Sequence, residues 1–494
     1  MYKLVLILKY LRRKLAPMFA ALAVTLCTAM VIIVISVMGG FLDLMRTSAR
    51  KLTGDVIVHG DITGFRHYQE MIDAIEALPE ADAATALISN FGLVNVNGHV
   101  VGAEVVGIDP EKFDNVVQYR ETLYWTSAHF LDMFRNDAFF SGQPPENQPA
   151  IEADIRTYEQ NEFRDFGMAF KPLPHGEQLP GCVMGIEVAP TNLRNKQGKY
   201  KLAESRTLGH QVTVTVVPLS AKGTLGAYEP ARGSFVIVNE SKSGLYDIDK
   251  SRAYVPFDLL QKMLKMERIE SPHFDPQTGE TLPGTKVTPA RATDIMVRGA
   301  PGVPLSQVRD AVQRATDAVV NDHGGDRFPF VMTWEDRHGV LLSAVQNEKG
   351  LITFLFAIIS VVAFVMVATT FYNIVLEKTH DIGVLRAIGG SRIGVASIFL
   401  GYGLAIGVIG AVLGFGMAWV IVFNLNEINL FLCNKFDVCM WKPQTYYFDE
   451  VPEQINAIEV IWIMIGAVVS SVGGSMIPAV VAAMTDPAQS LRHE

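Results

Sequence analysis

The chain of 494 residues has few cysteines and lacks the common nucleotide-binding and hydrolase motifs. It contains four cysteines and no C-x-x-C pair, which disfavours a thiolate metal site. There is no phosphate-binding G-x-x-x-x-G-K-[ST] loop, no H-E-x-x-H and no G-x-S-x-G. The eleven histidines show no close pairing at metal-ligand spacing. We therefore predict no catalytic residue, no metal site and no cofactor in this chain.

Charge is missing from four long stretches of the sequence. Residues 18–42, 351–376, 393–423 and 460–485 contain no Asp, Glu, Lys or Arg. Each stretch exceeds the roughly 20 apolar residues that cross a hydrocarbon core of about 30 Å. All 93 charged residues lie on the other 386 positions, a share of 24%, as in an ordinary soluble domain. The sequence thus excludes both a purely soluble enzyme and a many-span transporter. It predicts four membrane-spanning helices and a large folded domain.

Basic residues indicate the orientation of the predicted spans. Residues 1–17 carry five Lys and Arg and no acid, and with 377–392 and 486–494 they sum to a charge of +5. Residues 43–350 and 424–459 together carry −14. We expect both termini and the 377–392 connector to be cytoplasmic, with the 43–350 domain and the 424–459 loop outside. The net charge of −9 disfavours nucleic acid as a partner.

The first 17 residues combine an apolar face with basic side chains, YKLVLILKYLRRKLA after the initial Met. This pattern is typical of a helix that lies along the inner membrane interface and contacts lipids. A simple juxtamembrane anchor explains the same residues.

Residues 43–350 show a mixed α and β pattern. The Asn97-Gly98 pair between two apolar runs predicts a β-hairpin. From alternating and helical spacing we expect strands at 55–59, 91–96, 99–106, 211–217, 234–238, 253–256, 294–298 and 329–334, and helices at 67–78, 257–265, 304–320 and 335–349. The last helix is expected to run straight into the second span. Residues 141–149 and 271–289 are rich in Pro and Gly and predict loops. The domain is long enough for two subdomains.

Small residues recur every three or four positions in the last two predicted spans. They are Gly403, Gly407, Gly410 and Gly414 in the third span, and Gly466, Ser470, Gly473 and Gly474 in the fourth. Such rows allow close approach of helix backbones. Packing within one chain and packing against a second membrane chain explain them equally well. In the 424–459 loop, Cys433 and Cys439 form either a disulfide or two free thiols.

Six segments carry a family resemblance. They are 8–58, 104–110 (EVVGIDP), 185–188 (GIEV), 235–259, 333–355 and 377–391 (EKTHDIGVLRAIGGS). Together they resemble the lipoprotein-releasing ABC permeases of the LolC/LolE type, in the FtsX-like and MacB-like permease group. The resemblance implies four spans in the bacterial inner membrane, with a MacB-like periplasmic α+β domain inserted between the first and second. Residues around 120–180 and 266–292 match no pattern of that group.

The resemblance also implies a division of labour between chains. ATP and Mg²⁺ would bind to a separate ABC ATPase, while this non-catalytic chain pairs with a second permease chain, identical or different. The 377–392 connector would couple this chain to the ATPase through Glu377, Lys378, Asp381, Ile382, Gly383, Leu385, Arg386 and Gly389. Taken alone, Ile382, Val384, Leu385 and Ile388 give a short helix an apolar edge that either the membrane interface or an ATPase groove would cover. Gly389 and Gly390 are expected to end this helix. The work done would be release of a lipoprotein, passed to a periplasmic carrier.

A lipoprotein-releasing permease needs an apolar cavity. At about 0.8 kcal/mol per buried CH₂, exposing one long acyl chain to water costs on the order of 10 kcal/mol. We expect the cavity to be lined by Val37, Met38, Phe41, Leu42, Phe354 and Ile358. Ordinary helix packing explains these residues equally well. The alternative functions are MacB-like efflux, FtsX-like control of a cell-wall hydrolase, and a membrane scaffold that works without an ATPase.

Overall fold

The computed structural model of the protein describes residues 15–126, 149, 153, 170–172, 178–189, 207–219, 229–274, 281–324, 328–436 and 451–484. The chain divides into two compact units. One unit is helical and contains residues 1–44 together with most of the chain after Leu341. The other contains Met45–Val340 and is built on a β-sheet.

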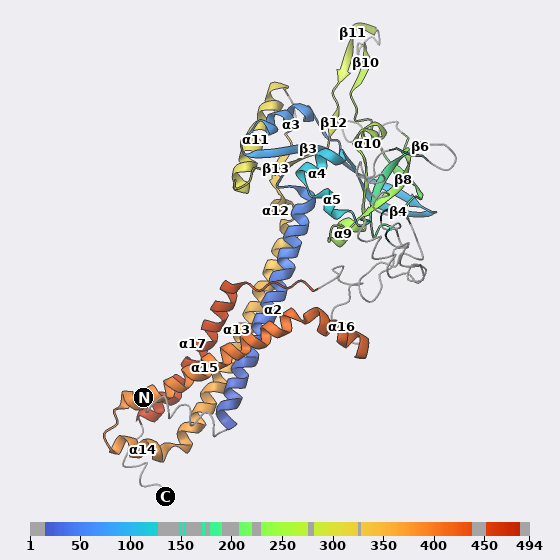
Figure 1. The fold of residues 1–494 in the computed structure, drawn as a ribbon. Helices are drawn as coiled ribbons and strands as arrows, with labels where there is room; N and C mark the ends of the chain where they lie inside the picture. The colour runs from blue at the N-terminus through green and yellow to red at the C-terminus, as the bar shows by residue number, and fades with distance from the viewer. Residues whose placement is uncertain are drawn as a thin grey trace. The chain divides into compact units, whose positions relative to one another are not determined.

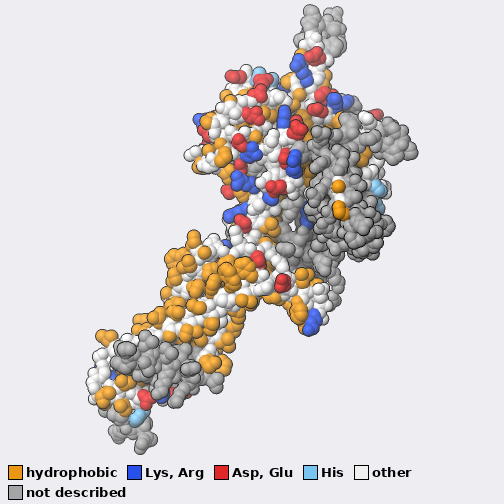
Figure 2. Space-filling view, in the orientation of Figure 1, with side chains coloured by type: hydrophobic (Ala, Val, Ile, Leu, Met, Phe, Trp, Pro, Cys, Tyr) orange, Lys and Arg blue, Asp and Glu red, His pale blue; other side chains and the backbone are white. Residues whose placement is uncertain are grey.

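The helical unit contains four long apolar helices, one for each predicted span. They are α2 (Leu15–Thr53), α13 (Gly339–Glu377), α15 (Arg392–Phe423) and α17 (Ala457–Met484). Each includes a stretch that is long and apolar enough to cross a membrane. Apolar side chains cover the visible face of this unit (Figure 2). Residues 1–14 and 485–494, which include most of the predicted interfacial helix and the whole tail, lie outside the described residues.

The segment after α15 is partly helical, where a loop was expected. Helix α16 spans Leu425–Phe436. Beyond it, the Asn426 side chain accepts a hydrogen bond from the Val451 N–H at 2.8 Å, which ties α16 to the approach to α17. Cys433 on α16 is disulfide-bonded. Its expected partner, Cys439, lies outside the described residues.

The second unit is built on a ten-stranded sheet (Figure 1). Its strands are β1 (Val56–His59), β3 (Ala81–Val96), β4 (His99–Ile108), β5 (Phe170–Pro172), β6 (Gln178–Gly185), β7 (Gln211–Val216), β8 (Ala231–Ser241), β9 (Arg252–Pro256), β13 (Asp294–Gly299) and β14 (Phe330–Thr333). The order is β14-β1-β13-β3-β4-β9-β6-β8-β7, with β5 on β6. Because β7 also pairs with β3, the six strands from β3 to β7 in this order close into a ring.

Strand β3 is long enough to belong to both the ring and the open part of the sheet. Residues 81–87 pair with β13, and residues 92–96 pair with β7. The strand then turns into β4 through Asn97 and Gly98, which have φ angles of 49° and 88°. Two consecutive positive φ angles are typical of the two-residue hairpin turn that Asn-Gly favours. The predicted hairpin is therefore confirmed.

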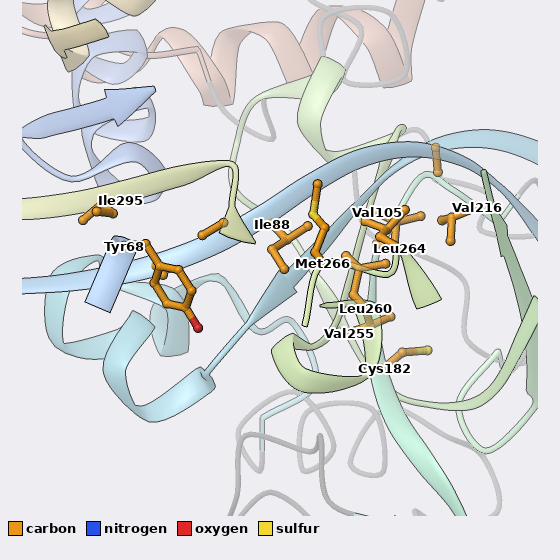
Figure 3. Packing of buried hydrophobic residues seen from close by; sticks show 14 of the residues in the cluster. Tyr68, Ile88, Val105, Cys182, Val216, Val255, Leu260, Leu264, Met266 and Ile295 are labelled. Atoms are coloured by element: carbon orange, nitrogen blue, oxygen red, sulfur yellow. The ribbon is translucent and has the colours of Figure 1, made fainter. Parts of the chain in front are cut away.

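Apolar side chains pack on both faces of the sheet. Ile88 and its neighbour Leu87 on β3 enter two different buried clusters, as alternation along a strand requires. Around Ile88 the sheet is covered by α3 (Tyr68–Glu76), α10 (Phe257–Met263) and α11 (Leu305–Asp322), and Figure 3 shows part of this packing. Around Leu87 it is covered by α4 (Pro110–Val116) and α5 (Tyr119–Thr122).

Two expectations for this unit are wrong. Most of residues 271–289 are in strands rather than in a loop, since β10 (Ile269–Phe274) and β11 (Thr281–Thr288) pair as antiparallel strands apart from the main sheet (Figure 1), while residues 275–280 lie outside the described residues. The helix expected to begin at 335 and run without interruption into the second span is broken. It consists of α12 (Trp334–Arg337) and then α13, which begins at Gly339. Short elements that were not expected are β2 (Phe65–Arg66), α9 (Tyr246–Asp249) and β12 (Arg291–Ala292).

Candidate functional site

The connector between α13 and α15 forms the short helix α14 (Thr379–Ala387). Two glycines end it, as the sequence predicted. Gly389 has a φ of 101°, which a residue with a Cβ rarely adopts. The Gly390 N–H donates to the Leu385 carbonyl at 3.0 Å, and the Gly389 N–H donates to the Arg386 carbonyl at 3.1 Å. These two bonds form a Schellman cap, so α14 ends in a fixed turn.

One side of α14 is fastened to the helical unit. Ile382 is 4% exposed and packs in a cluster with Phe371 and Val375 of α13. The same cluster contains Phe399 of α15 and Ala479 and Ala482 of α17. Gly383 is also buried. The expectation that Ile382 forms part of an exposed edge is therefore wrong, because this side chain faces the other helices.

Arg386 continues the fastened side of α14. Its Nη1 donates a hydrogen bond to the Ala483 carbonyl at 3.2 Å, near the end of α17. The carbonyls of a last helical turn lack partners within the helix and carry partial negative charge. The guanidinium therefore satisfies one of them and contributes to holding α14 against α17.

The opposite side of α14 is exposed. Val384 is 40% exposed and Ile388 is 77% exposed, while Leu385 is half-buried. Acidic groups flank these apolar side chains, because Glu377 and Asp381 are exposed as well. Lys378 Nζ pairs with Asp381 Oδ2 at 2.7 Å. The free side of α14 is thus a small apolar patch with a partly acidic border.

Gly403 and Gly407 of α15 allow close contact with α17. A Cβ on Gly403 would lie 2.6 Å from Ser475 Cβ, and one on Gly407 would lie 2.9 Å from Ser471 Cβ. Real Cβ atoms do not come this close to such neighbours. Ser471 Oγ donates to the Gly403 carbonyl at 2.8 Å, which adds an interhelical hydrogen bond at the point of closest approach.

The remaining glycines are placed differently from one another. A Cβ on Gly410 would lie 2.6 Å from Val24 Cγ1, and one on Gly414 would lie 2.8 Å from Thr28 Cβ, both on α2. Gly473 faces α13, where a Cβ would lie 3.1 Å from a ring carbon of Phe364. Gly466 is exposed, with no atom of another helix near the position of a Cβ. Gly466 therefore makes no close helix contact within this chain, and its packing against a second membrane chain stays a prediction.

An apolar pocket of about 470 Å³ lies among α2, α13 and α17. Its lining includes Val31, Ile35, Phe356, Ala357, Gly466 and Ala467. None of the six residues predicted to line a cavity belongs to it. Phe354 and Ile358 are 66% and 49% exposed, and their helix positions place them on another side of α13 from Phe356. The predicted residues Val37, Met38, Phe41 and Leu42 lie further along α2 than the pocket-lining Ile35.

One group of potential ligands escaped the sequence analysis. His67, Glu70 and His323 of the sheet unit come together, although Glu70 and His323 are 253 positions apart. Hydrogen bonding with the two imidazoles holds the pKa of the Glu70 carboxyl below its ordinary value. The prediction that the chain contains no metal-ligand grouping rested on spacing along the sequence, which does not reveal contacts at this separation.

Comparison with known proteins finds a family match in the last third of the chain. Residues 353–487 match the family described as FtsX-like permease C-terminal. The chain is also 24% identical over 299 residues to the lipoprotein-releasing system transmembrane protein LolC of Neisseria meningitidis. It is 22% identical over 174 residues to the corresponding LolE protein of Haemophilus influenzae. Residues 353–487 are thus similar to the FtsX-like permease C-terminal family, and the chain is similar to proteins of the LolC/LolE type. The matched region begins in α13 and contains α14, α15 and the whole of α17.

The alignments do not cover whole proteins. The match to the Neisseria relative covers 59% of this permease and 63% of the relative, and the match to the Haemophilus relative covers 35% and 41%. Among solved structures, the periplasmic region of MacB from Actinobacillus actinomycetemcomitans covers 59% of the permease and 93% of that chain. Its identity is 11% and its TM-score 0.28, and a likeness at this level carries no argument about function.

Proposed function

We propose that this permease is the membrane subunit of an ABC transporter that releases lipoproteins from the bacterial inner membrane. A separate ATPase would supply the energy, and a second permease chain would complete the membrane part. In this proposal the four apolar helices are the spans, and both termini and α14 are cytoplasmic. The sheet unit is a periplasmic domain inserted between the first and second spans. The charge distribution and the family support this arrangement.

The observation that carries the proposal is the two-sided construction of α14. One side is fixed to the neighbouring helices by Ile382 and Arg386, and the other presents Val384 and Ile388 to solvent. Exposed apolar side chains grouped on one side of a helix indicate a contact surface. An ATPase groove that covers this surface would gain apolar contact area, and basic residues at its border would complement Glu377 and Asp381.

Close packing gives α14 a route to the rest of the unit. A displacement of α14 would be transmitted to α17 through the hydrogen bond between Arg386 and the Ala483 carbonyl. From α17 it reaches α15 at Gly403 and Gly407, and α15 in turn contacts α2 at Gly410. Interfaces without voids resist compression and therefore transmit displacement. The chain needs no nucleotide site of its own if it acts as this kind of lever.

The pocket among α2, α13 and α17 supports the choice of a lipid-modified substrate. It lies in the apolar part of the permease, and its volume of about 470 Å³ is within the roughly 300–1,000 Å³ of small-ligand sites. An acyl chain that moves from the bilayer into this pocket keeps its apolar surroundings. It thereby avoids the cost, on the order of 10 kcal/mol, of exposure to water. A soluble carrier would then accept the released lipoprotein.

A photo-crosslinking amino acid in the pocket tests the substrate. The probe is placed at Ala357, which lines the pocket, and in a matched control at Leu355, which is 49% exposed and lies two residues away, on the opposite side of the same helix. We expect crosslinks to acylated proteins from Ala357 and far fewer from Leu355. If drugs or unacylated peptides are captured instead, the function is efflux rather than lipoprotein release. If a cell-wall hydrolase is captured, the function is control of that hydrolase. Equal labelling at both positions would remove the pocket as the substrate site.

A further inference from the structure

The sheet unit carries a compact group of three metal-ligating side chains. His67 precedes α3, Glu70 lies in the first turn of α3, and His323 follows the last residue of α11. Two imidazole nitrogens and a carboxylate oxygen of this group all lie within 4.8 Å of one another. His67 Nδ1 lies 3.0 Å from Glu70 Oε1, and His323 Nε2 contacts Glu70 Oε2. The two imidazole rings stack, with centroids 3.8 Å apart and planes inclined by 8°.

The framework around this group is rigid. Tyr68 and Met71 of α3 and Val320 of α11 are buried in the main apolar cluster of the sheet unit. Tyr68 and Met71 are direct neighbours of His67 and Glu70, and Val320 lies three positions before His323. His67 adopts a left-handed backbone conformation, with φ at 59°. Histidine is among the few residues that tolerate this conformation. The main-chain positions of the three ligands are therefore fixed by the packing of two helices.

We propose that His67, Glu70 and His323 form a binding site for a divalent transition metal ion, with Zn²⁺ as the best fit. Two imidazoles and one carboxylate make a donor set that Zn²⁺ uses with a water molecule in the fourth position. In a tetrahedral site with bonds of about 2.0–2.1 Å, ligand atoms lie roughly 3.4 Å apart. The present separations, 3.0 Å between His67 Nδ1 and Glu70 Oε1 and none above 4.8 Å, are close to this spacing.

The position of the group allows its side chains to rotate. All three side chains are partly exposed, with relative side-chain exposures between 27% and 52%. A metal ion requires the imidazole nitrogens to point at it in the plane of each ring, so the stacked rings must open on binding. Solvent access leaves room for this movement and for the water ligand. Mg²⁺ and Ca²⁺ fit less well, because they prefer sites made of oxygen ligands.

The bound ion would connect the start of α3 to the end of α11. The two helices cover the same part of the sheet, and their ligands lie far apart in the sequence (Figure 1). A metal bridge of this kind restricts the relative movement of the helices, because separating them breaks a metal–ligand bond. The site would therefore stiffen the sheet unit, which is the periplasmic domain under the proposed function. The binding site itself rests only on the three side chains and does not depend on that function.

The test uses the full-length protein in detergent, produced without a polyhistidine tag and treated with a chelator. Zn²⁺ is titrated by calorimetry, and Co²⁺ is added in parallel because its visible absorption reports tetrahedral coordination with nitrogen and oxygen ligands. We expect one ion per chain and a Zn²⁺-dependent increase in the thermal unfolding temperature. His323→Asn, His67→Asn and Glu70→Gln should each weaken binding by about 100-fold or more, since even a lost second-shell partner costs roughly 10–100-fold in metal affinity.

The Zn²⁺ titration has a control variant and an outcome that would overturn the proposal. Asn keeps the left-handed backbone accessible at position 67, so His67→Asn is expected to fold. His99→Asn removes an exposed imidazole of the same unit outside the group and should bind Zn²⁺ like the unmodified protein. Absence of stoichiometric Zn²⁺ binding would overturn the proposal. Unchanged stoichiometry and affinity in His323→Asn would overturn it as well, because the ion would then be bound elsewhere. Neither result bears on ATPase coupling, so the two proposals fail separately.

Discussion

Arg386 on α14 donates a hydrogen bond to the backbone carbonyl of Ala483 on α17, across 97 positions of the sequence. The residue that sequence comparison suggests as a contact for an ATPase is thus engaged within its own chain. The exposed apolar residues Val384 and Ile388 are better placed for a contact with a partner. We therefore predict different effects for substitutions on the two sides of α14. The buried side should affect the transmission of movement to α17, and the exposed side should affect binding of the ATPase.

Replacing Ile388 should weaken the docking of the ATPase. Ile388→Asp places a charge in the exposed patch and opposes burial of that patch in a partner. We expect reduced copurification of the ATPase and a fall in its stimulated activity of about tenfold, which corresponds to about 1.4 kcal/mol of binding. Val340→Asp is the control, since Val340 is 90% exposed in the first turn of α13, at the other end of that helix from α14. Stimulation that survives Ile388→Asp unchanged would exclude this side of α14 as the docking surface.

Replacing Arg386 should affect transmission rather than docking. Arg386→Gln shortens the side chain and removes the charged donor to Ala483. A hydrogen bond from a charged group contributes roughly 1.5–3 kcal/mol. The ATPase is expected to copurify as before, while its stimulation by the permease decreases. Copurification and ATPase activity measured on the same preparation separate the two effects. If copurification of the ATPase is lost together with its stimulation, Arg386 contributes to the docking surface.

The contact between α15 and α17 should be sensitive to a single methyl group. Gly403→Ala would place a Cβ 2.6 Å from Ser475 Cβ and force the helices apart. Overpacking of this kind costs about 1–3 kcal/mol. We expect a lower thermal unfolding temperature in detergent for Gly403→Ala than for Gly416→Ala. Gly416 is on the same helix and has open space at the position of a Cβ. Equal unfolding temperatures would contradict the close approach.

A largely buried ion pair in the sheet unit should make stability depend on pH. Arg252 Nη2 lies 2.7 Å from Glu104 Oε2, and the Ser89 hydroxyl donates to Glu104 Oε1 at 2.6 Å. Burial raises the pKa of Glu104, but Arg252 and Ser89 outweigh it and hold the pKa below its ordinary value. The folded state therefore binds this proton less readily than the unfolded state. The pair stabilises the fold above the unfolded pKa of about 4.3, and this contribution is lost as the pH falls through the folded pKa.

Glu104→Gln measures the contribution of that pair. The variant leaves Arg252 without its counter-charge, which costs about 3 kcal/mol for a buried pair. We expect the full decrease in thermal unfolding temperature at pH 7 and a smaller one below about pH 4. Glu270→Gln is the control, because Glu270 pairs with Arg268 on the surface, where an ion pair contributes roughly 0–1 kcal/mol. A decrease that does not change with pH would show that Glu104 acts through packing alone.

Local signals were sufficient for much of the fold. The four charge-free stretches correspond to α2, α13, α15 and α17, and the Asn97-Gly98 turn lies between β3 and β4. Strand β6 was missed because its eight residues contain Pro180, Gly181 and Gly185, and the residues that follow Leu179 are buried without alternation. Strand β10 was missed because Pro272 and the polar residues after it are typical of a loop. Proline is tolerated there because β10 and β11 form a separate two-stranded sheet, and the register shifts beside Pro272.

The site was less accessible to sequence analysis. Sequence spacing identified the α14 segment and its terminal glycines, but it did not reveal which side of the helix is buried against Phe371 and Phe399. The pocket is lined by other residues of α13 than Phe354 and Ile358, because an apolar stretch without charges does not indicate which side of a helix faces its neighbours. The meeting of Glu70 with His323 depends on the packing of α3 beside α11, which no local pattern encodes.

ATP-dependent release of a lipoprotein tests the central claim most directly. The permease, with the ATPase that copurifies with it, is reconstituted into liposomes that contain a triacylated lipoprotein, and a soluble acceptor is added outside. We expect lipoprotein to leave the membrane only with hydrolysable ATP, and release to fall in Ile388→Asp in proportion to ATPase stimulation. Release that proceeds without ATP, or nucleotide hydrolysis by this chain alone, would contradict the account.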